Sequence, residues 1–327
     1  MRRVLRSKLF QVAQTRPFGR LVGALEAWRS RDCGRLAVLM YHRVDEFDRR
    51  PDLDPALISA TPEAFRLQMG FLRDHCHVVS LDEVLSAVQG RSRLPSRAVL
   101  ITFDDAYSDF SLHAWPVLRE HGLPVTVFVP TAYPEERERA FWWDRLHQAL
   151  HSGVGPEALA GVLPDGQAGS TSTKRLRNFL KELPHEETIQ RVEEIARRGG
   201  LPPARNEVLD WDALRALASE GVTLAPHTRT HPLLTRVSPG EARAEIARSI
   251  EDLKRELRGG PIPAAFAFPS GAHNASVRQI LKELGVKAAF LTQRGVNRLG
   301  RCDPLQLARI NVGRTTPLEL LRLQMAL

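Results

Sequence analysis

The 327-residue chain is predicted to form an α/β fold around a parallel sheet or barrel. From residue 36 onward, short apolar runs alternate with segments of helical periodicity, the pattern of repeated strand–helix units. Polar residues with acid–base or metal-binding chemistry follow several of these runs directly, where parallel strands end and active sites gather. Between about 142 and 206 the strand pattern stops and the sequence becomes helical and charged. We interpret this stretch as a helical insertion, not as a second domain.

The individual elements follow from local patterns. The expected strands are short runs of aliphatic and aromatic residues, at 36–40, 78–79, 98–103, 125–129, 222–225, 264–268 and 288–291. The expected helices lie between them, at 61–75, 81–88, 111–121, 212–219, 239–257 and 275–284. Thr61 is placed to cap the first helix, with Pro62 at its first helical position. The segment 111–121 is expected to be helical although it contains Pro116.

The positive charge of the chain is concentrated at its start. The whole sequence carries a net charge of +8, of which residues 1–35 hold +7, with nine Lys or Arg and two acidic residues. We therefore divide the chain into a basic N-terminal segment, 1–35, and a nearly neutral domain, 36–327. The segment is interpreted as a solvated, partly helical tail, an interfacial helix in contact with anionic lipid, or a nucleic-acid arm. The neutral domain itself gives no reason to expect nucleic-acid binding.

Two kinds of segment are missing from the sequence. No apolar run has the length of a signal-peptide core or a membrane span, which favours a location in the cytoplasm or peripherally at the inner face of the membrane.

The three cysteines, Cys33, Cys76 and Cys302, are far apart and form no CxxC pair. They therefore predict neither a disulfide framework nor a thiolate zinc site.

Candidate catalytic residues follow the expected strands. Adjacent carboxylates, Asp104 and Asp105, come directly after one apolar strand, and burying both as charges is costly unless a metal relieves one of them. His227 and His231 follow another strand and are four residues apart, as on a single helical turn. One carboxylate and two histidines leave metal positions open for water and substrate, and the spare carboxylate can act as a general base. Non-haem iron oxygenases share this donor set, but their sites usually lie on antiparallel β folds.

The sequence resembles the NodB-homology polysaccharide deacetylases, carbohydrate esterase family 4. The resemblance rests on Thr102-Phe103-Asp104-Asp105, on His227-Thr228-Arg229-Thr230-His231 and on Phe268-Pro269-Ser270-Gly271, and it covers about 36–312. It implies a distorted (β/α)7 barrel, a divalent metal that is usually Zn²⁺, and hydrolysis of N-acetyl or O-acetyl groups on a sugar. The implied substrate is an acetylated glycan, with chitin-like oligomers, peptidoglycan, exopolysaccharide and lipid-linked precursors all open.

The resemblance also implies roles for individual residues. Asp104 would be the catalytic base, and Asp105, His227 and His231 would be the metal ligands. The backbone N–H of Ser270 would contribute to the oxyanion hole.

The sequence departs from the family pattern at three places. Ala106 stands where the first motif normally continues with Gly, and Ala267 stands where the family has the arginine that orients the base. Arg309 is a candidate replacement for that arginine, the alternative being a surface arginine. The late Leu-x-His that supplies the family's general acid has no match. These departures keep open a second interpretation, a catalytically degenerate barrel that binds metal and carbohydrate.

Four further residues are candidates for contact with the substrate. His42 and His273 are possible general acids in place of the missing histidine, with water as the alternative. Trp143 and Tyr107 offer aromatic surfaces for a sugar ring, although aromatic residues more often pack in the core.

Overall fold

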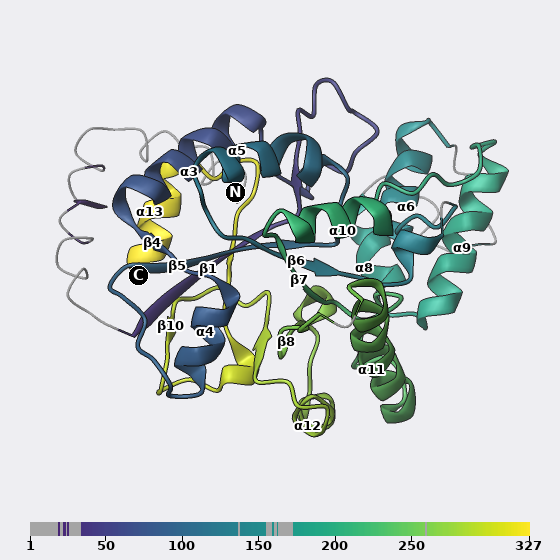
Figure 1. Cartoon of the computed structure of the whole chain (residues 1–327). Helices are drawn as coiled ribbons and strands as arrows, with labels where there is room; N and C mark the ends of the chain where they lie inside the picture. The colour runs from purple at the N-terminus through teal and green to yellow at the C-terminus, as the bar shows by residue number, and fades with distance from the viewer. Residues whose placement is uncertain are drawn as a thin grey trace.

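A twisted, mostly parallel sheet forms the centre of the structure, a computed structural model (Figure 1). Its main path runs β10–β1–β5–β6–β7, with β11 beside β1 and β4 beside β5, and only the β1–β10 pairing is antiparallel. These strands are β1 (Arg35–Tyr41), β4 (His77–Val78), β5 (Ala98–Asp104), β6 (Thr126–Val129), β7 (Thr223–Pro226), β10 (Asn297–Arg298) and β11 (Ile310–Asn311). Two small sheets pair β2 (Arg43–Val44) with β3 (Ile58–Ala60) and β8 (Ala265–Ala267) with β9 (Ala288–Phe290).

The structure describes residues 34–136, 138–154, 173–258 and 260–327, with isolated positions at 19, 22, 23, 25, 159 and 162. Most of the basic segment 1–35, and with it the predicted membrane contact, lies outside the described residues. In the part of the chain that is described, no helix combines the length and the apolar composition that crossing a bilayer requires.

The β8–β9 sheet lies between the two ends of the main sheet, with a seam between β7 and β8. A parallel bridge joins Phe290 of β9 to Leu307, and the chain continues from there into β11, which pairs with β1. A mostly parallel sheet flanked by helices, with β8 and β9 beside it, is consistent with a distorted barrel and confirms the predicted α/β, NodB-type fold class. No ladder joins β7 to β8 in the described chain; instead the imidazole of His227 lies 2.7 Å from the carbonyl oxygen of Ala267 across the seam.

The register of the strands brings the predicted motifs to one edge. Every residue of β1 and β5 is buried, as expected for parallel strands covered on both faces. Tyr41 pairs with Phe103, Asp104 pairs with Phe128, and Val129 pairs with Pro226. The residues that follow these pairs therefore meet at the carboxyl edge of the sheet.

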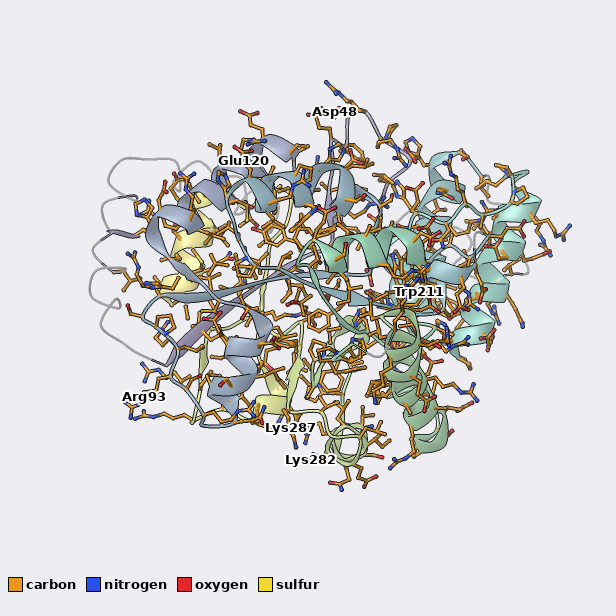
Figure 2. The ribbon with its side chains drawn as sticks, viewed as in Figure 1. Asp48, Arg93, Glu120, Trp211, Lys282 and Lys287 are labelled. Carbon is orange, nitrogen blue, oxygen red and sulfur yellow. The ribbon has the colours of Figure 1, made fainter. Side chains whose placement is uncertain are left out.

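The helices confirm most of the predicted elements. They are α3 (Pro62–His75), α4 (Leu81–Val88), α5 (Trp115–Glu120), α6 (Trp142–His151), α8 (Thr173–Leu180), α9 (His185–Arg198), α10 (Trp211–Ser219), α11 (Pro239–Glu256), α12 (Ala275–Glu283) and α13 (Leu318–Ala326). Thr61 caps α3 as predicted, accepting a hydrogen bond from the N–H of Ala64 at 3.2 Å. Charged side chains such as Asp48, Glu120 and Lys282 project from the periphery (Figure 2).

One predicted helix differs in form. The segment 111–121 begins with a π-helical turn, Phe110–Ala114, and only then continues as α5. Pro116 has no N–H, and its ring would clash with the carbonyl four residues earlier in a regular helix, so a wider turn fits better.

The described part of 142–206 consists of α6, α8 and α9, which lie together beside the sheet, at the right of Figure 1. Residues 165–173 are rich in Gly, Ser and Thr, which predicts a break between helices, but they fall almost wholly outside the described residues. We refer to the described residues of 142–206 as the insertion.

Candidate functional site

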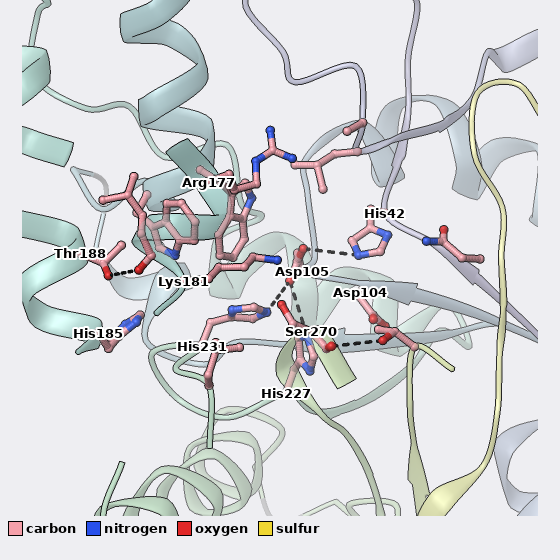
Figure 3. Close-up of a pocket in the computed structure, with 18 of the residues that line it drawn as sticks. His42, Asp104, Asp105, Arg177, Lys181, His185, Thr188, His227, His231 and Ser270 are labelled. Carbon is pink, nitrogen blue, oxygen red and sulfur yellow. Dashed lines mark hydrogen bonds and ion pairs between the residues drawn. The ribbon is translucent and has the colours of Figure 1, made fainter. Parts of the chain in front are cut away.

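Three predicted metal ligands converge at the carboxyl edge of the sheet (Figure 3). Asp105 Oδ1 lies 3.6 Å from His227 Nε2 and 3.4 Å from His231 Nε2. All three residues are buried, and one ligand atom from each lies within 4.8 Å of the others. A carboxylate and two imidazoles at this spacing form a donor set for one divalent ion.

The burial, hydrogen bonding and pKa shifts of these three side chains are compatible with a bound metal ion. Asp105 Oδ1 is buried with no hydrogen-bond partner among the described residues, and burial, with the nearby charge of Asp104, raises the pKa of Asp105 well above its usual range. Burial lowers the pKa of both histidines, which favours the neutral, ligating imidazole. His227 Nδ1 donates to the Ala267 carbonyl, which leaves the Nε2 lone pair facing Asp105. The donor set and its surroundings therefore fit a divalent cation.

A loop, and not the helical turn we expected, presents the two histidines. Thr228 and His231 have φ angles of 64° and 61°, in the left-handed region. The Oγ1 atom of Thr228 accepts a hydrogen bond from the N–H of His231 at 3.0 Å. Glu245 of α11 accepts hydrogen bonds from the N–H groups of Arg229 and Thr230, both at 2.8 Å. These bonds offset the backbone strain and hold the loop that carries both histidines.

Asp104 and Arg309 form a buried, two-pronged ion pair. Arg309 NH1 lies 2.7 Å from Asp104 Oδ1, and NH2 lies 2.6 Å from Oδ2. Arg309 is 0% exposed, so the alternative of a surface arginine is excluded, and its Nε donates to the carbonyl of Leu291 at 2.8 Å. Burial alone would raise the pKa of Asp104, but the charge and hydrogen bonds of Arg309, together with the nearby His227 and His42, outweigh burial, so the pKa lies below its usual value. Asp104 is therefore an oriented carboxylate that is ionised at neutral pH.

His42, Trp143 and Ser270 lie in the wall of the same cavity, which has a volume of about 280 Å³ and also contains Asp104 and Asp105. His42 Nε2 is 4.0 Å from Asp105 Oδ2, and burial lowers the pKa of His42 to about 4. Ser270 follows β8 with a φ of 52°, in the left-handed region.

Tyr107 and His273 are absent from the wall of this cavity. Tyr107 is fully buried; its hydroxyl donates to Asp144 at 2.7 Å and accepts from Trp143 at 3.0 Å. It has a packing role in place of the substrate contact we expected, because these bonds hold Trp143 edge-on against His231, with 4.9 Å between ring centroids. His273 lies 3.0 Å from the carbonyl oxygen of Gly271 and 3.2 Å from Gln306.

Ala106, which stands where the family has Gly, affects the local backbone but not the cavity. Ala106 has a φ of 52°, so the backbone keeps the left-handed conformation that suits glycine. Its methyl group is buried and lies outside the wall of the cavity. The departure from the family pattern therefore adds strain without narrowing the cavity.

Sequence reasoning missed one part of the site. Four side chains of the cavity wall, Arg177, Lys181, His185 and Arg236, belong to the insertion and to the loop before α11. No motif marks them, because only the folding of the insertion brings them to the catalytic edge.

Gly271 offers a test of the Ser270 loop. A Cβ atom on Gly271 would lie 2.3 Å from Thr292 Oγ1 and 2.8 Å from the Thr292 backbone nitrogen, and the φ of 71° is itself unfavourable for alanine. We expect Gly271→Ala to lower the free energy of unfolding by about 2–4 kcal/mol and to reduce activity. Gly285→Ala is the matched control, since Gly285 has a φ of 82° with nothing within 4 Å. Urea unfolding should show that Gly285→Ala lowers the free energy of unfolding by only about 1 kcal/mol. Equal losses of stability in the two variants would show that a Cβ atom on Gly271 does not clash with Thr292.

The fold and the site together define the chain as a NodB-type α/β protein with a buried carboxylate–arginine pair and a group of side chains that could hold a metal at the carboxyl edge of its sheet. It belongs to the polysaccharide deacetylase family, whose model matches residues 91–289, more than half of the chain. The predicted family is thereby confirmed.

Two curated relatives are similar over part of their length. The poly-β-1,6-N-acetyl-D-glucosamine N-deacetylase of Escherichia coli K12 is 24% identical over 262 residues, 77% of this chain and 34% of the relative. The putative polysaccharide deacetylase YxkH of Bacillus subtilis is 29% identical over 105 residues, 32% of this chain and 35% of the relative. The chain thus spans about a third of the length of these relatives.

Two solved structures show the same fold. The Streptococcus pyogenes deacetylase PplD, in complex with acetate, is 21% identical with a TM-score of 0.61, covering 89% of this chain and 98% of its own. IcaB from Ammonifex degensii is 20% identical with a TM-score of 0.59, covering 90% and 98%.

Proposed function

We propose that the protein is a Zn²⁺-dependent hydrolase that removes N-acetyl, or O-acetyl, groups from a poly- or oligosaccharide of cell-surface or exopolysaccharide metabolism. The observation that carries the proposal is the Asp104–Arg309 pair beside the Asp105, His227 and His231 cluster. An ionised, oriented base next to a metal-ligand set is the arrangement that water attack on an amide or ester requires. The E. coli relative is, by its name, an N-deacetylase of poly-β-1,6-N-acetyl-D-glucosamine.

Each residue has a part in the proposed hydrolysis. Asp105, His227 and His231 would hold the ion, which when bound polarises the acetyl carbonyl and the attacking water. Asp104 takes the proton of that water while Arg309 keeps the carboxylate in position. The backbone N–H of Ser270 is the proposed donor to the carbonyl oxygen as it becomes negative.

Protonation of the leaving nitrogen remains to be assigned to a group. Of the two predicted acids, His42 lines the cavity, but with its pKa lowered to about 4 it holds no proton to give at neutral pH. The proton that Asp104 has taken from water is available at the same place, so we propose that Asp104 delivers it to the leaving group.

One of the two arguments for a catalytically degenerate barrel no longer applies. That interpretation depended on a missing arginine and a missing acid histidine. Arg309 holds both oxygens of Asp104, as a base-orienting arginine would.

Acetate release tests the proposal. The metal-loaded protein should release acetate from at least one member of a panel of chitin oligomers, β-1,6-linked N-acetylglucosamine oligomers, peptidoglycan fragments and O-acetylated xylan. A chelator should abolish the release, and Zn²⁺ should restore it. Metal-loaded, folded protein that releases no acetate from the whole panel would favour the degenerate barrel.

A further inference from the structure

One wall of the catalytic cavity is basic. Arg177, Lys181 and Arg236 all line it, and Figure 3 shows Lys181 extending toward Asp105, with the guanidinium of Arg177 farther from Asp105 in the same wall. The carboxylates among the lining residues are Asp104 and Asp105, both of which belong to the catalytic cluster. Away from that cluster, the formal charges on the described wall are all positive.

Two of the three cations have carboxylate partners that are not among the lining residues. Arg177 pairs with Asp54, and Arg236 pairs with Glu182. The Asp54 pair fixes the guanidinium of Arg177 but leaves its Nε buried with no hydrogen-bond partner among the described residues. Arg177 is therefore both positioned and incompletely satisfied.

Lys181 has no ion-pair partner among the residues that the structure describes, although its side chain is half-buried. Burial, together with the nearby charge of Arg177, lowers the pKa of its ammonium group. His185, also in this wall, has a buried Nε2 without a described partner. A half-buried cation beside another cation carries a free-energy penalty that a bound anion would remove.

The small size of the cavity limits where such an anion lies. At about 280 Å³, it is near the lower end for small-molecule sites. An anion on this wall, with the acetyl group at the catalytic cluster, must belong to the acetylated sugar or to its immediate neighbour.

We propose that Lys181, with Arg177 and His185, binds an oxyanion on the glycan, a carboxylate or a phosphate ester, next to the acetylated sugar. The inference rests on the proposed deacetylase function and gives its substrate class: an anionic glycan in place of a neutral one. The same wall repels the ammonium group that N-deacetylation produces, which favours product release and disfavours repeated action along a polyamine chain.

Matched substrates test the inference. Three acetylated hexosamine oligomers of equal length would be compared: one neutral, one with a neighbouring uronic acid, and one with a phosphate ester. We expect kcat/KM for an anionic oligomer to exceed that for the neutral one by about tenfold or more, and to fall with added salt. Comparing the uronic-acid oligomer with the phosphate-ester oligomer shows whether the wall prefers a carboxylate or a phosphate.

Variants at Lys181 locate the effect. Lys181→Gln should lower the anionic-to-neutral ratio of kcat/KM by about tenfold, and Lys181→Arg should restore most of it. Lys282→Gln is the control, since Lys282 lies on α12 at the periphery (Figure 2). A ratio near one in the wild-type protein, or a ratio unchanged in Lys181→Gln, would overturn the inference.

A binding measurement separates this inference from the proposed function. Calorimetric titration of the chelated protein with the same oligomers needs no turnover. Tighter binding of an anionic oligomer that Lys181→Gln weakens supports the basic wall even if no acetate is released, whereas equal affinities with normal acetate release would refute only the basic wall.

Discussion

Asp104→Asn is expected to lower kcat by about 10²–10⁴-fold while the protein keeps its metal. The amide has nearly the shape of the carboxylate but is no base, so it cannot take a proton from water. The metal ligands Asp105, His227 and His231 are untouched by the change. The measurement is kcat on the best substrate of the panel, together with metal content per chain.

Stability must be followed in the same variant. Arg309 is fully buried, and an amide in place of its carboxylate partner leaves a buried charge incompletely paired. A thermal unfolding curve therefore accompanies the kinetics, and the comparison is made below the onset of unfolding. Activity of folded Asp104→Asn equal to that of the wild type would show that another group is the base.

Arg309→Met is expected to have the second large effect, on both stability and pH dependence. Removing the partner of a buried carboxylate costs about 3–5 kcal/mol at neutral pH. With Arg309 gone, burial raises the pKa of Asp104, so the acidic limb of the kcat/KM profile should move to higher pH. Arg309→Lys should recover part of both effects, because it restores the charge but not the two-pronged geometry.

The direction of the pH effect on stability follows from the sign of each shift. In the wild type the pKa of Asp104 lies below its unfolded value of about 3.9, so the pair stabilises the fold above that pH and the contribution is lost as pH falls through the folded pKa. In Arg309→Met the folded pKa lies above the unfolded value, so the penalty is present at high pH and relieved as pH falls. Arg301→Met, at an exposed turn, is the control. A variant with unchanged stability and an unchanged acidic limb would show that the pair does not tune the base.

The catalytic cluster was largely predictable because its residues follow strands. Asp104, Asp105 and His227 each come directly after a buried apolar run, and parallel strands carry such residues to a common edge. The role of Arg309 was harder to predict from the sequence. It depends on the late segment returning beside β1, which places it against a residue 205 positions away.

Other features depended on contacts that no local pattern encodes. Tyr107 has the sequence position of a substrate contact, but Asp144 and Trp143 of the insertion satisfy its hydroxyl and bury it. The strands β2, β10 and β11 have two residues each, too few to give a periodic signal. Lys181 is an ordinary helix-end lysine until the insertion folds against the catalytic edge.

Metal content tests the central claim most directly. Elemental analysis of the purified protein after Zn²⁺ loading and desalting should give about one ion per chain in the wild type and in Asp104→Asn. Asp105→Ala and His227→Ala, checked for folding by thermal unfolding, should each retain little or none. Full metal content in folded Asp105→Ala would place the ion elsewhere and contradict the site described for this protein.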